Sequence, residues 1–248
     1  MTLLADISHF SGFCAALARR GPHAPEQLAE IAFHTWTLFI RCLLPVIAVV
    51  FPFGMVIALQ GLSIFELFGA QRLLSSMISV VSFRELAPLL ASILVAAQGG
   101  SAIAAELGTM RLQEELDATE VMGIDSLQVH VLPRLSACII ATPLLNLVGA
   151  VGGVAGGAFS AVLLKGESWG VYYNSLWELT QASDIAGGLI KSVTFGLIIG
   201  LTACYHGYFV RGGAEGVGRA VNKTVVFACT SFIVANYFVS SALFGALH

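Results

Sequence analysis

The stretch LSACIIATPLLNLVGAVGGVAGGAFSAVLL, residues 135–164, decides the fold because it contains no Asp, Glu, Lys or Arg. A helix of about 20 apolar residues crosses the hydrocarbon core of a bilayer, so this stretch is long enough to span a membrane. Four further charge-free stretches lie at residues 42–60, 86–105, 192–210 and 224–248. They lack the short alternating pattern of a membrane β-barrel, so we expect an all-α integral membrane protein with five transmembrane helices.

The composition excludes other classes of protein. Of the 248 residues, 57% are apolar and 11% are charged, whereas about 25% are charged in a soluble domain. A net charge of -3 does not indicate nucleic-acid binding, which usually needs a clustered basic surface. The five cysteines stand singly without metal-ligand spacing, so we expect them to pack as small apolar residues and we expect no metal site.

The distribution of Lys and Arg predicts the orientation, because cytoplasmic loops carry an excess of both. Five spans place the termini on opposite sides. A cytoplasmic N-terminus puts eight cations inside: Arg19, Arg20, Arg41, Arg111, Arg134, Arg211, Arg219 and Lys223. Four then lie outside: Arg72, Arg84, Lys165 and Lys191. We therefore predict a cytoplasmic N-terminus and a C-terminus on the outer side.

Residues 1–41 form a predicted N-terminal region that precedes the transmembrane domain at 42–248. Its apolar residues recur every three to four positions, at Leu3, Ile7, Phe10, Cys14 and Leu17, and again after Pro25. This periodicity favours amphipathic helices that lie in the cytoplasmic interface or pack on the protein's own spans. Residues 62–83 are interrupted by charges, so we expect an outer-leaflet loop or a re-entrant piece there.

Arg84 and Glu85 begin the second charge-free stretch. Neighbouring residues on a helix point in different directions, so this pair cannot neutralise itself. Pro88 removes the amide that would bond the Arg84 carbonyl. Ionisable groups at membrane depth are costly, so the two side chains either contact a ligand headgroup or form interhelical ion pairs. Lys191 is a weaker candidate, because a long Lys side chain can reach the interface.

Glycines at positions 149, 153 and 157 form a ridge along the third span. Such a ridge lets helix backbones approach closely. It predicts a helix contact either inside one subunit or between two subunits.

Residues 106–125 are the most polar part of the chain, with six acids: Glu106, Glu114, Glu115, Asp117, Glu120 and Asp125. Helical spacing of the apolar residues predicts a short cytoplasmic helix over about 112–122, and Gly123 suits its C-terminus. By composition, this helix is either a solvated connector or a docking surface for a partner.

Four glycines at 212, 213, 216 and 218 stand beside Arg211, Arg219 and Lys223, which is a weak indication of phosphate binding. The sequence contains no P-loop motif and no catalytic motif of the metalloprotease or serine-hydrolase type. We therefore expect no catalytic residues, and we do not expect the chain to be an enzyme.

Two long motifs resemble the signatures of the MlaE/YrbE permease family. The first comprises FRELAP at 83–88, GSAIAAELGTM at 100–110 and EELDATEVMGID at 114–125. The second comprises CYHGY at 204–208, GGA at 212–214, GVG at 216–218 and VNKTVV at 221–226. The resemblance covers about residues 40–245.

This resemblance implies the permease subunit of an ABC transporter in the bacterial inner membrane, which moves phospholipid or a related lipid. ATP would be bound by a separate ATPase subunit, and the permease itself would need no cofactor. The implied partners are that ATPase, a second permease copy or paralogue, and an MCE-domain protein on the outer, periplasmic side. The alternatives are an ion-coupled secondary transporter and a membrane scaffold that transports nothing.

The resemblance also implies two sets of site residues. The lipid pocket would contain Ile57, Gln60, Phe65, Phe68, Arg84 and Glu85. The helix that couples to the ATPase would contain Glu114, Glu115, Asp117, Glu120, Met122 and Gly123. Two positions depart from the family pattern, with Gln98 replacing an Arg and Asn236 replacing an Asp that many relatives carry.

Overall fold

The computed structural model describes residues 2–20, 25–69, 73–164, 166 and 168–245, with the side chains of all of these except 2–7, 25–26 and 164. The described residues are helical apart from short turns and contain no β-strand. Five of their helical stretches are long and apolar enough to cross a membrane: Gln27–Leu67, Leu73–Leu112, Leu127–Leu163, Ala182–Tyr208 and Gly213–Phe244. The expected all-α integral membrane fold with five spans is confirmed.

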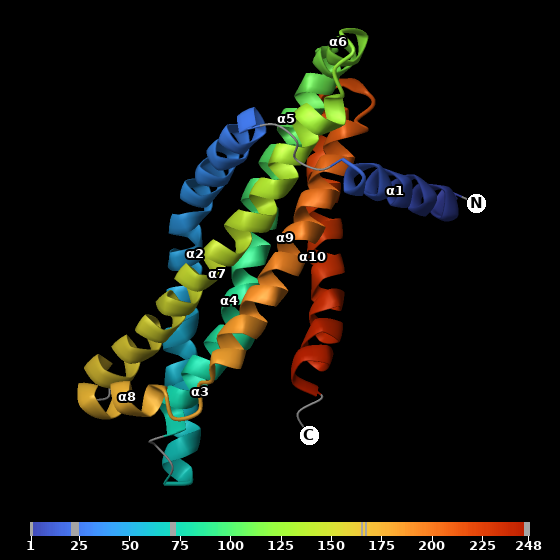
Figure 1. Ribbon diagram of the computed structural model, residues 1–248. Coiled ribbons are helices and arrows are strands. Elements are labelled where there is room, and N and C mark those ends of the chain that lie inside the picture. Colours follow the sequence, from blue (N-terminus) through green and yellow to red (C-terminus); the bar gives the residue numbers. More distant parts are fainter. Residues whose placement is uncertain (1, 21–24, 70–72, 165, 167, 246–248) are drawn as a thin grey trace. The chain divides into compact units, whose positions relative to one another are not determined.

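The helices follow one another along the chain as labelled in Figure 1. The α-helices are α1 (Thr2–Ala18), α2 (Pro25–Leu67), α3 (Leu73–Val81), α4 (Ala87–Leu94), α5 (Ser101–Leu112), α6 (Glu115–Val121), α7 (Leu132–Ala158), α8 (Trp169–Leu176), α9 (Ala182–Tyr208) and α10 (Gly213–Phe244). Four π-helical segments widen the turns between them: η1 (Ser82–Leu86), η2 (Val95–Gly100), η3 (Leu127–Val131) and η4 (Phe159–Leu164).

Helices run across two positions where the sequence suggested a boundary. No helix ends near residue 41, because α2 continues unbroken from Pro25 to Leu67 and contains both Pro45 and Pro52. Proline is tolerated inside membrane helices, where neighbouring groups satisfy the freed backbone. For residues 62–83, where we expected an outer-leaflet loop or a re-entrant piece, α2 covers the start and α3 begins at Leu73, so a plain loop is wrong and the re-entrant piece stays a prediction. The side chains of Leu3 and Ile7, and residues Arg72 and Lys165, lie outside the described part of the chain.

The chain divides into two compact units, each assembled from three separate segments. Unit 1 comprises Met1–Leu38, Val95–Ala141 and Phe195–Ala235. Unit 2 comprises Phe39–Leu94, Thr142–Thr194 and Asn236–His248. Long helices such as α2 and α7 therefore contribute residues to both units.

In unit 2, α2 and α7 pack backbone against backbone through glycine. A Cβ atom added at Gly54 would lie 2.1 Å from the Gly153 oxygen, and one added at Gly156 would lie 2.1 Å from the Phe51 oxygen. Any larger residue would force the helices apart, so the glycine ridge of α7 makes its contact inside the chain. Beside it, a cluster from α2, α3, α7, η4 and α8 is buried: Ala58, Leu62, Leu74, Ile78, Ala158, Ala161, Val162, Tyr172 and Leu176.

In unit 1, aromatic side chains hold α1 and α10 against α9. The rings of Phe195 and Phe232, both fully buried, lie 5.4 Å apart between α9 and α10. In α1, the rings of Phe10 and Phe13 lie 5.1 and 5.7 Å from that of Tyr205 in α9. The apolar stripe of α1 thus packs on one of the protein's own spans, which was one of the two readings that the sequence left open.

Candidate functional site

Pro88 shapes the backbone around Arg84 and Glu85 in unit 2. A proline cannot donate to the carbonyl four residues earlier, and its ring pushes that carbonyl away. The helix accordingly widens into η1 over Ser82–Leu86. The Arg84 carbonyl oxygen instead accepts a hydrogen bond of 2.8 Å from Lys191 Nζ. The sequence predicted that this carbonyl lacks its helical donor, and Lys191 of α9 supplies a donor in its place.

Glu85 is the centre of a polar cluster that joins three helical segments. Its Oε1 lies 2.5 Å from Lys191 Nζ, and the Lys191 side chain is completely buried. Asn236 Nδ2 of α10 donates to Glu85 Oε2 at 3.1 Å, and Ser240 Oγ donates to Oε1 at 3.1 Å. A buried ammonium is tolerated because a carboxylate and a carbonyl oxygen share its three protons.

Arg84 pairs with Asp184, which lies in the first turn of α9 and is completely buried. Its Nε and Nη2 approach Asp184 Oδ1 at 2.8 and 2.7 Å. Asp184 Oδ2 also accepts the backbone N–H of Gln181 at 3.0 Å, which caps the start of α9. The guanidinium stacks over the Phe244 ring, 4.5 Å from its centroid. Both ends of the Asp184 carboxylate are thus satisfied.

Arg84 and Glu85 therefore form interhelical ion pairs, which was one of the two roles that the sequence left open for them. Two cations and two carboxylates balance each other inside unit 2, so the cluster carries no net charge. The side chains of Arg84 and Glu85 nevertheless keep 33% and 40% of their surface exposed. The cluster therefore stabilises helix packing and still offers a polar surface to a ligand.

The four other predicted lipid-binding residues fall into two groups. Ile57 and Phe65 are half-buried and pack against the core cluster of unit 2. Gln60 and Phe68 are exposed, and Phe68 keeps 78% of its surface exposed. The assignment of these residues to a lipid pocket stays a prediction, and only the second pair is free of a packing role in the core.

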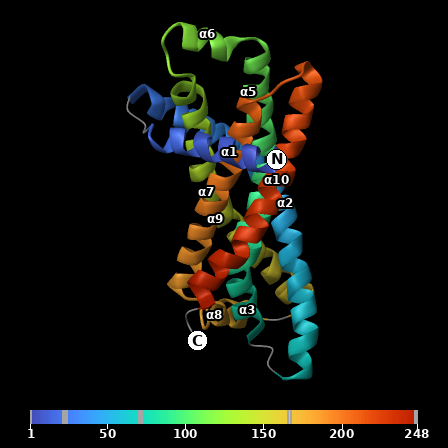
Figure 2. The same cartoon turned by 90° about the vertical axis from the view of Figure 1, so that its right-hand side faces the viewer.

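The acidic segment belongs to unit 1 and forms a shorter helix than expected. The described helix α6 covers Glu115–Val121 and follows a turn at Glu114, whose φ is +60°. Gly123 follows the helix with φ +78°, so its predicted place at the C-terminus is correct. Figures 1 and 2 both show α6 projecting beyond the end of α5. Met122 is 68% exposed, and Glu115 and Asp117 also face outward.

Glu120 fixes the orientation of α6 through two hydroxyl groups. Ser126 Oγ and Tyr208 Oη donate to Glu120 Oε1 at 2.7 and 2.8 Å. These hydrogen bonds favour the ionised carboxylate and hold the pKa of Glu120 below its ordinary value. Asp117 is held in turn by Arg111 at 2.5 Å. The helix is therefore attached to α5 and α9 by its polar side chains, while its acids at 114 and 115 remain exposed.

Sequence reasoning missed Asp184 and underestimated Lys191. Asp184 is one charge near the start of a long apolar helix, and Lys191 lies seven residues later, two helical turns along the same face. Their charges are opposite in sign to those of Arg84 and Glu85, with which they pair. A search for complementary charges in different spans could have found the cluster.

The fold and the buried ion pairs define a multi-pass helical membrane protein. The Permease MlaE family model matches residues 31–242. A probable ABC transporter permease protein of Rickettsia bellii is 38% identical over 220 residues, which cover 88% of this chain and 82% of that relative. The intermembrane phospholipid transport system permease protein MlaE of Haemophilus influenzae is 33% identical over 199 residues, with 78% and 74% coverage. The chain belongs to the MlaE permease family.

Proposed function

We propose that this permease moves phospholipid or a related lipid between the inner membrane and an MCE-domain carrier, driven by ATP hydrolysis on a separate subunit. The observation that carries the proposal is the match of the Permease MlaE model to residues 31–242. The Haemophilus relative is a permease protein of an intermembrane phospholipid transport system, which supports the class of cargo.

The polar cluster and the exposed side chains at the end of α2 and just after it have the chemistry that a lipid site needs. A lipid site needs apolar walls for the acyl chains and a few polar groups for the head. Phe68 supplies exposed apolar surface, Gln60 an exposed amide, and Arg84 and Glu85 partly exposed charges. We propose that these residues contact the cargo.

The exposed face of α6 fits a docking surface for the ATPase. It combines carboxylates at Glu114 and Glu115 with the apolar side chains of Val121 and Met122, which are 88% and 68% exposed. Exposed apolar groups surrounded by charge are typical of a protein interface. We propose that the ATPase binds there.

We also propose that the N-terminus is cytoplasmic, in agreement with the count of Lys and Arg. As the family resemblance implies, we propose that the permease acts as a dimer.

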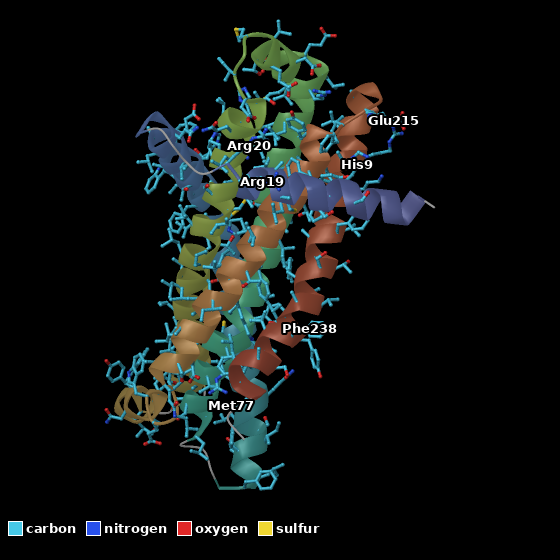
Figure 3. The ribbon with its side chains drawn as sticks, turned by 45° about the vertical axis from the view of Figure 1, so that its right-hand side comes forward. His9, Arg19, Arg20, Met77, Glu215 and Phe238 are labelled. Carbon is cyan, nitrogen blue, oxygen red and sulfur yellow. The ribbon has the colours of Figure 1, made fainter. Side chains whose placement is uncertain are left out.

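The lipid assignment is tested by transfer of a fluorescent phosphatidylethanolamine from vesicles that contain the complete complex to its MCE protein. We expect ATP-dependent transfer, and we expect Phe68→Ser to lower its rate at least about fivefold, because an acyl-chain contact is lost. Phe238→Ser is the matched control, since Phe238 is a 65% exposed aromatic residue that projects from α10 (Figure 3). Equal rates for wild type and Phe68→Ser would remove Phe68 from the lipid site.

Docking of the ATPase is tested by co-purification. We expect the double variant Glu114→Lys and Glu115→Lys to retain about tenfold less ATPase, because like charges then face the partner. Glu178→Lys, an exposed acid in unit 2, is the control and should retain the normal amount. Normal retention by the double variant would contradict docking on α6.

A further inference from the structure

Unit 1 contains a cavity of about 670 Å³ beside the connection between α9 and α10. It is lined by the last turns of α9, the connecting turn, the N-terminal half of α10 and Phe10 of α1. A volume of about 300 to 1,000 Å³ is usual for small-molecule sites. The cavity contains none of the residues discussed above for lipid transfer or ATPase docking.

The polar part of the cavity is cationic. Arg211 comes from the connecting turn, while Arg219 and Lys223 stand four residues apart on one face of α10. All three are exposed, and Arg219 Nη1 lies 2.7 Å from Glu215 Oε1 on the same helix. Figure 3 labels Glu215 at the start of α10. Three cations against this one neighbouring acid leave an excess of positive charge that favours an anion.

The rest of the cavity is aromatic. The ring of Phe10 meets Tyr205 edge-on with centroids 5.1 Å apart, and His206 stacks on Phe227 at 5.5 Å. Phe209 and Phe227 keep 46% and 54% of their surface exposed. An apolar wall of this kind accommodates a hydrocarbon chain better than a soluble polar anion.

The cavity lies at the ends of two candidate spans, and this position favours the headgroup of an anionic lipid as the anion. The fourth candidate span ends at Tyr208 and the fifth begins at Gly213. Cations and aromatic residues at span ends lie at the depth of lipid headgroups. The Lys and Arg count predicts this end to be cytoplasmic, where anionic lipids are enriched and bind basic pockets between helices.

We propose that this cavity binds an anionic phospholipid, with its phosphate against Arg211, Arg219 and Lys223 and the upper part of one acyl chain against Phe209 and Phe227. The site shares no residue with the proposed lipid pocket. It would hold a resident lipid and make the permease sensitive to the charge of the surrounding membrane.

The test compares lipids retained by the full-length protein in nanodiscs of equal parts dioleoylphosphatidylglycerol and dioleoylphosphatidylcholine, read by native mass spectrometry. We expect the wild type to retain phosphatidylglycerol selectively. The double variant Arg211→Gln and Lys223→Gln should lower the ratio of the two retained lipids about tenfold, since each cation near the surface contributes to anionic-lipid binding. Arg41→Gln, an exposed cation outside the cavity, should leave the ratio unchanged.

A charge-conserving variant, Arg211→Lys with Lys223→Arg, controls for folding and should keep most of the selectivity. Excess inorganic phosphate should displace little phosphatidylglycerol, because the acyl chain contributes to binding. Equal retention of both lipids by the wild type would overturn the proposal. So would efficient displacement by phosphate, or an unchanged ratio in the glutamine variant.

Discussion

The charged cluster of unit 2 and the charged helix α6 of unit 1 use the same residue types for opposite purposes. In unit 2, Lys191 and Asp184 are completely buried, and their partners come from η1, about 100 positions away in the sequence. Around α6, Arg111 and Asp117 are six positions apart and 35% and 51% exposed. Water screens both members of the second pair but is excluded from Asp184 and Lys191, so only the cluster of unit 2 should contribute strongly to stability.

The largest expected effect is that of Lys191→Met. It removes the cation from Glu85 and the donor from the Arg84 carbonyl, and we expect a loss of about 3 kcal/mol in the free energy of unfolding, measured by denaturation in mixed detergent. Adding Glu85→Gln should restore part of this loss, because no unpaired carboxylate remains. A Lys191→Met variant as stable as the wild type would show that the buried pair has no structural role.

Asp184→Asn should have the next largest effect. The amide keeps the size of the side chain but gives up a charge-assisted interaction with the Arg84 guanidinium, which is worth about 2 kcal/mol in the same unfolding measurement. Ser183→Ala changes the exposed neighbouring residue and should alter stability little. If the two variants were equally stable, the ion pair would be as weak as a surface pair.

Tyr208→Phe tests the attachment of α6 and should cost about 1 kcal/mol at neutral pH, because Glu120 loses one hydroxyl donor. The native-state pKa of Glu120 is held low, so its carboxylate stabilises the fold above the unfolded-state pKa, and this stability disappears as the pH falls through the native pKa. The difference between wild type and Tyr208→Phe should therefore shrink below about pH 4.3, the ordinary pKa of Glu.

The control for this pH series is Tyr237→Phe, which alters a 73% exposed ring on α10. Its stability should follow that of the wild type at every pH. A Tyr208→Phe difference that stays constant down to pH 3 would mean that the hydroxyl acts through Ser126 Oγ, 2.8 Å away, and not through Glu120.

The smallest effect is expected for Glu215→Gln. The ion pair with Arg219 is 59% and 81% exposed at its two side chains and spans one turn of α10, so its loss should change the free energy of unfolding by less than about 0.5 kcal/mol. A change of 2 kcal/mol would place this surface pair in the same class as the buried cluster of unit 2.

Much of the fold could be predicted because apolar length reports directly on the bilayer. All five spans lie where charge-free stretches occur, although α2 extends beyond its stretch at both ends. The ends were missed because Arg41 and Glu66 interrupt the apolar pattern without interrupting the helix. A helix in or near a membrane tolerates such charges where their side chains reach water or headgroups.

The candidate sites were predictable to different degrees. The position of α6 and the αL conformation of Gly123 are local features, so sequence spacing was sufficient to find them. The partners of Arg84 and Glu85 lie in α9 and α10, and no local pattern relates them. The sequence could state only that each charge needs a partner.

The sequence by itself determined that this chain is a membrane protein with five helical spans, since a surface so poor in charge can be solvated only by lipid. It also located the acids at 114–125 and the basic residues at 211–223. Only the tertiary structure decided which charges neutralise each other and which stay exposed. That choice depends on which helix faces become neighbours, because a buried charge is stable only where another segment brings its counter-charge within hydrogen-bonding distance.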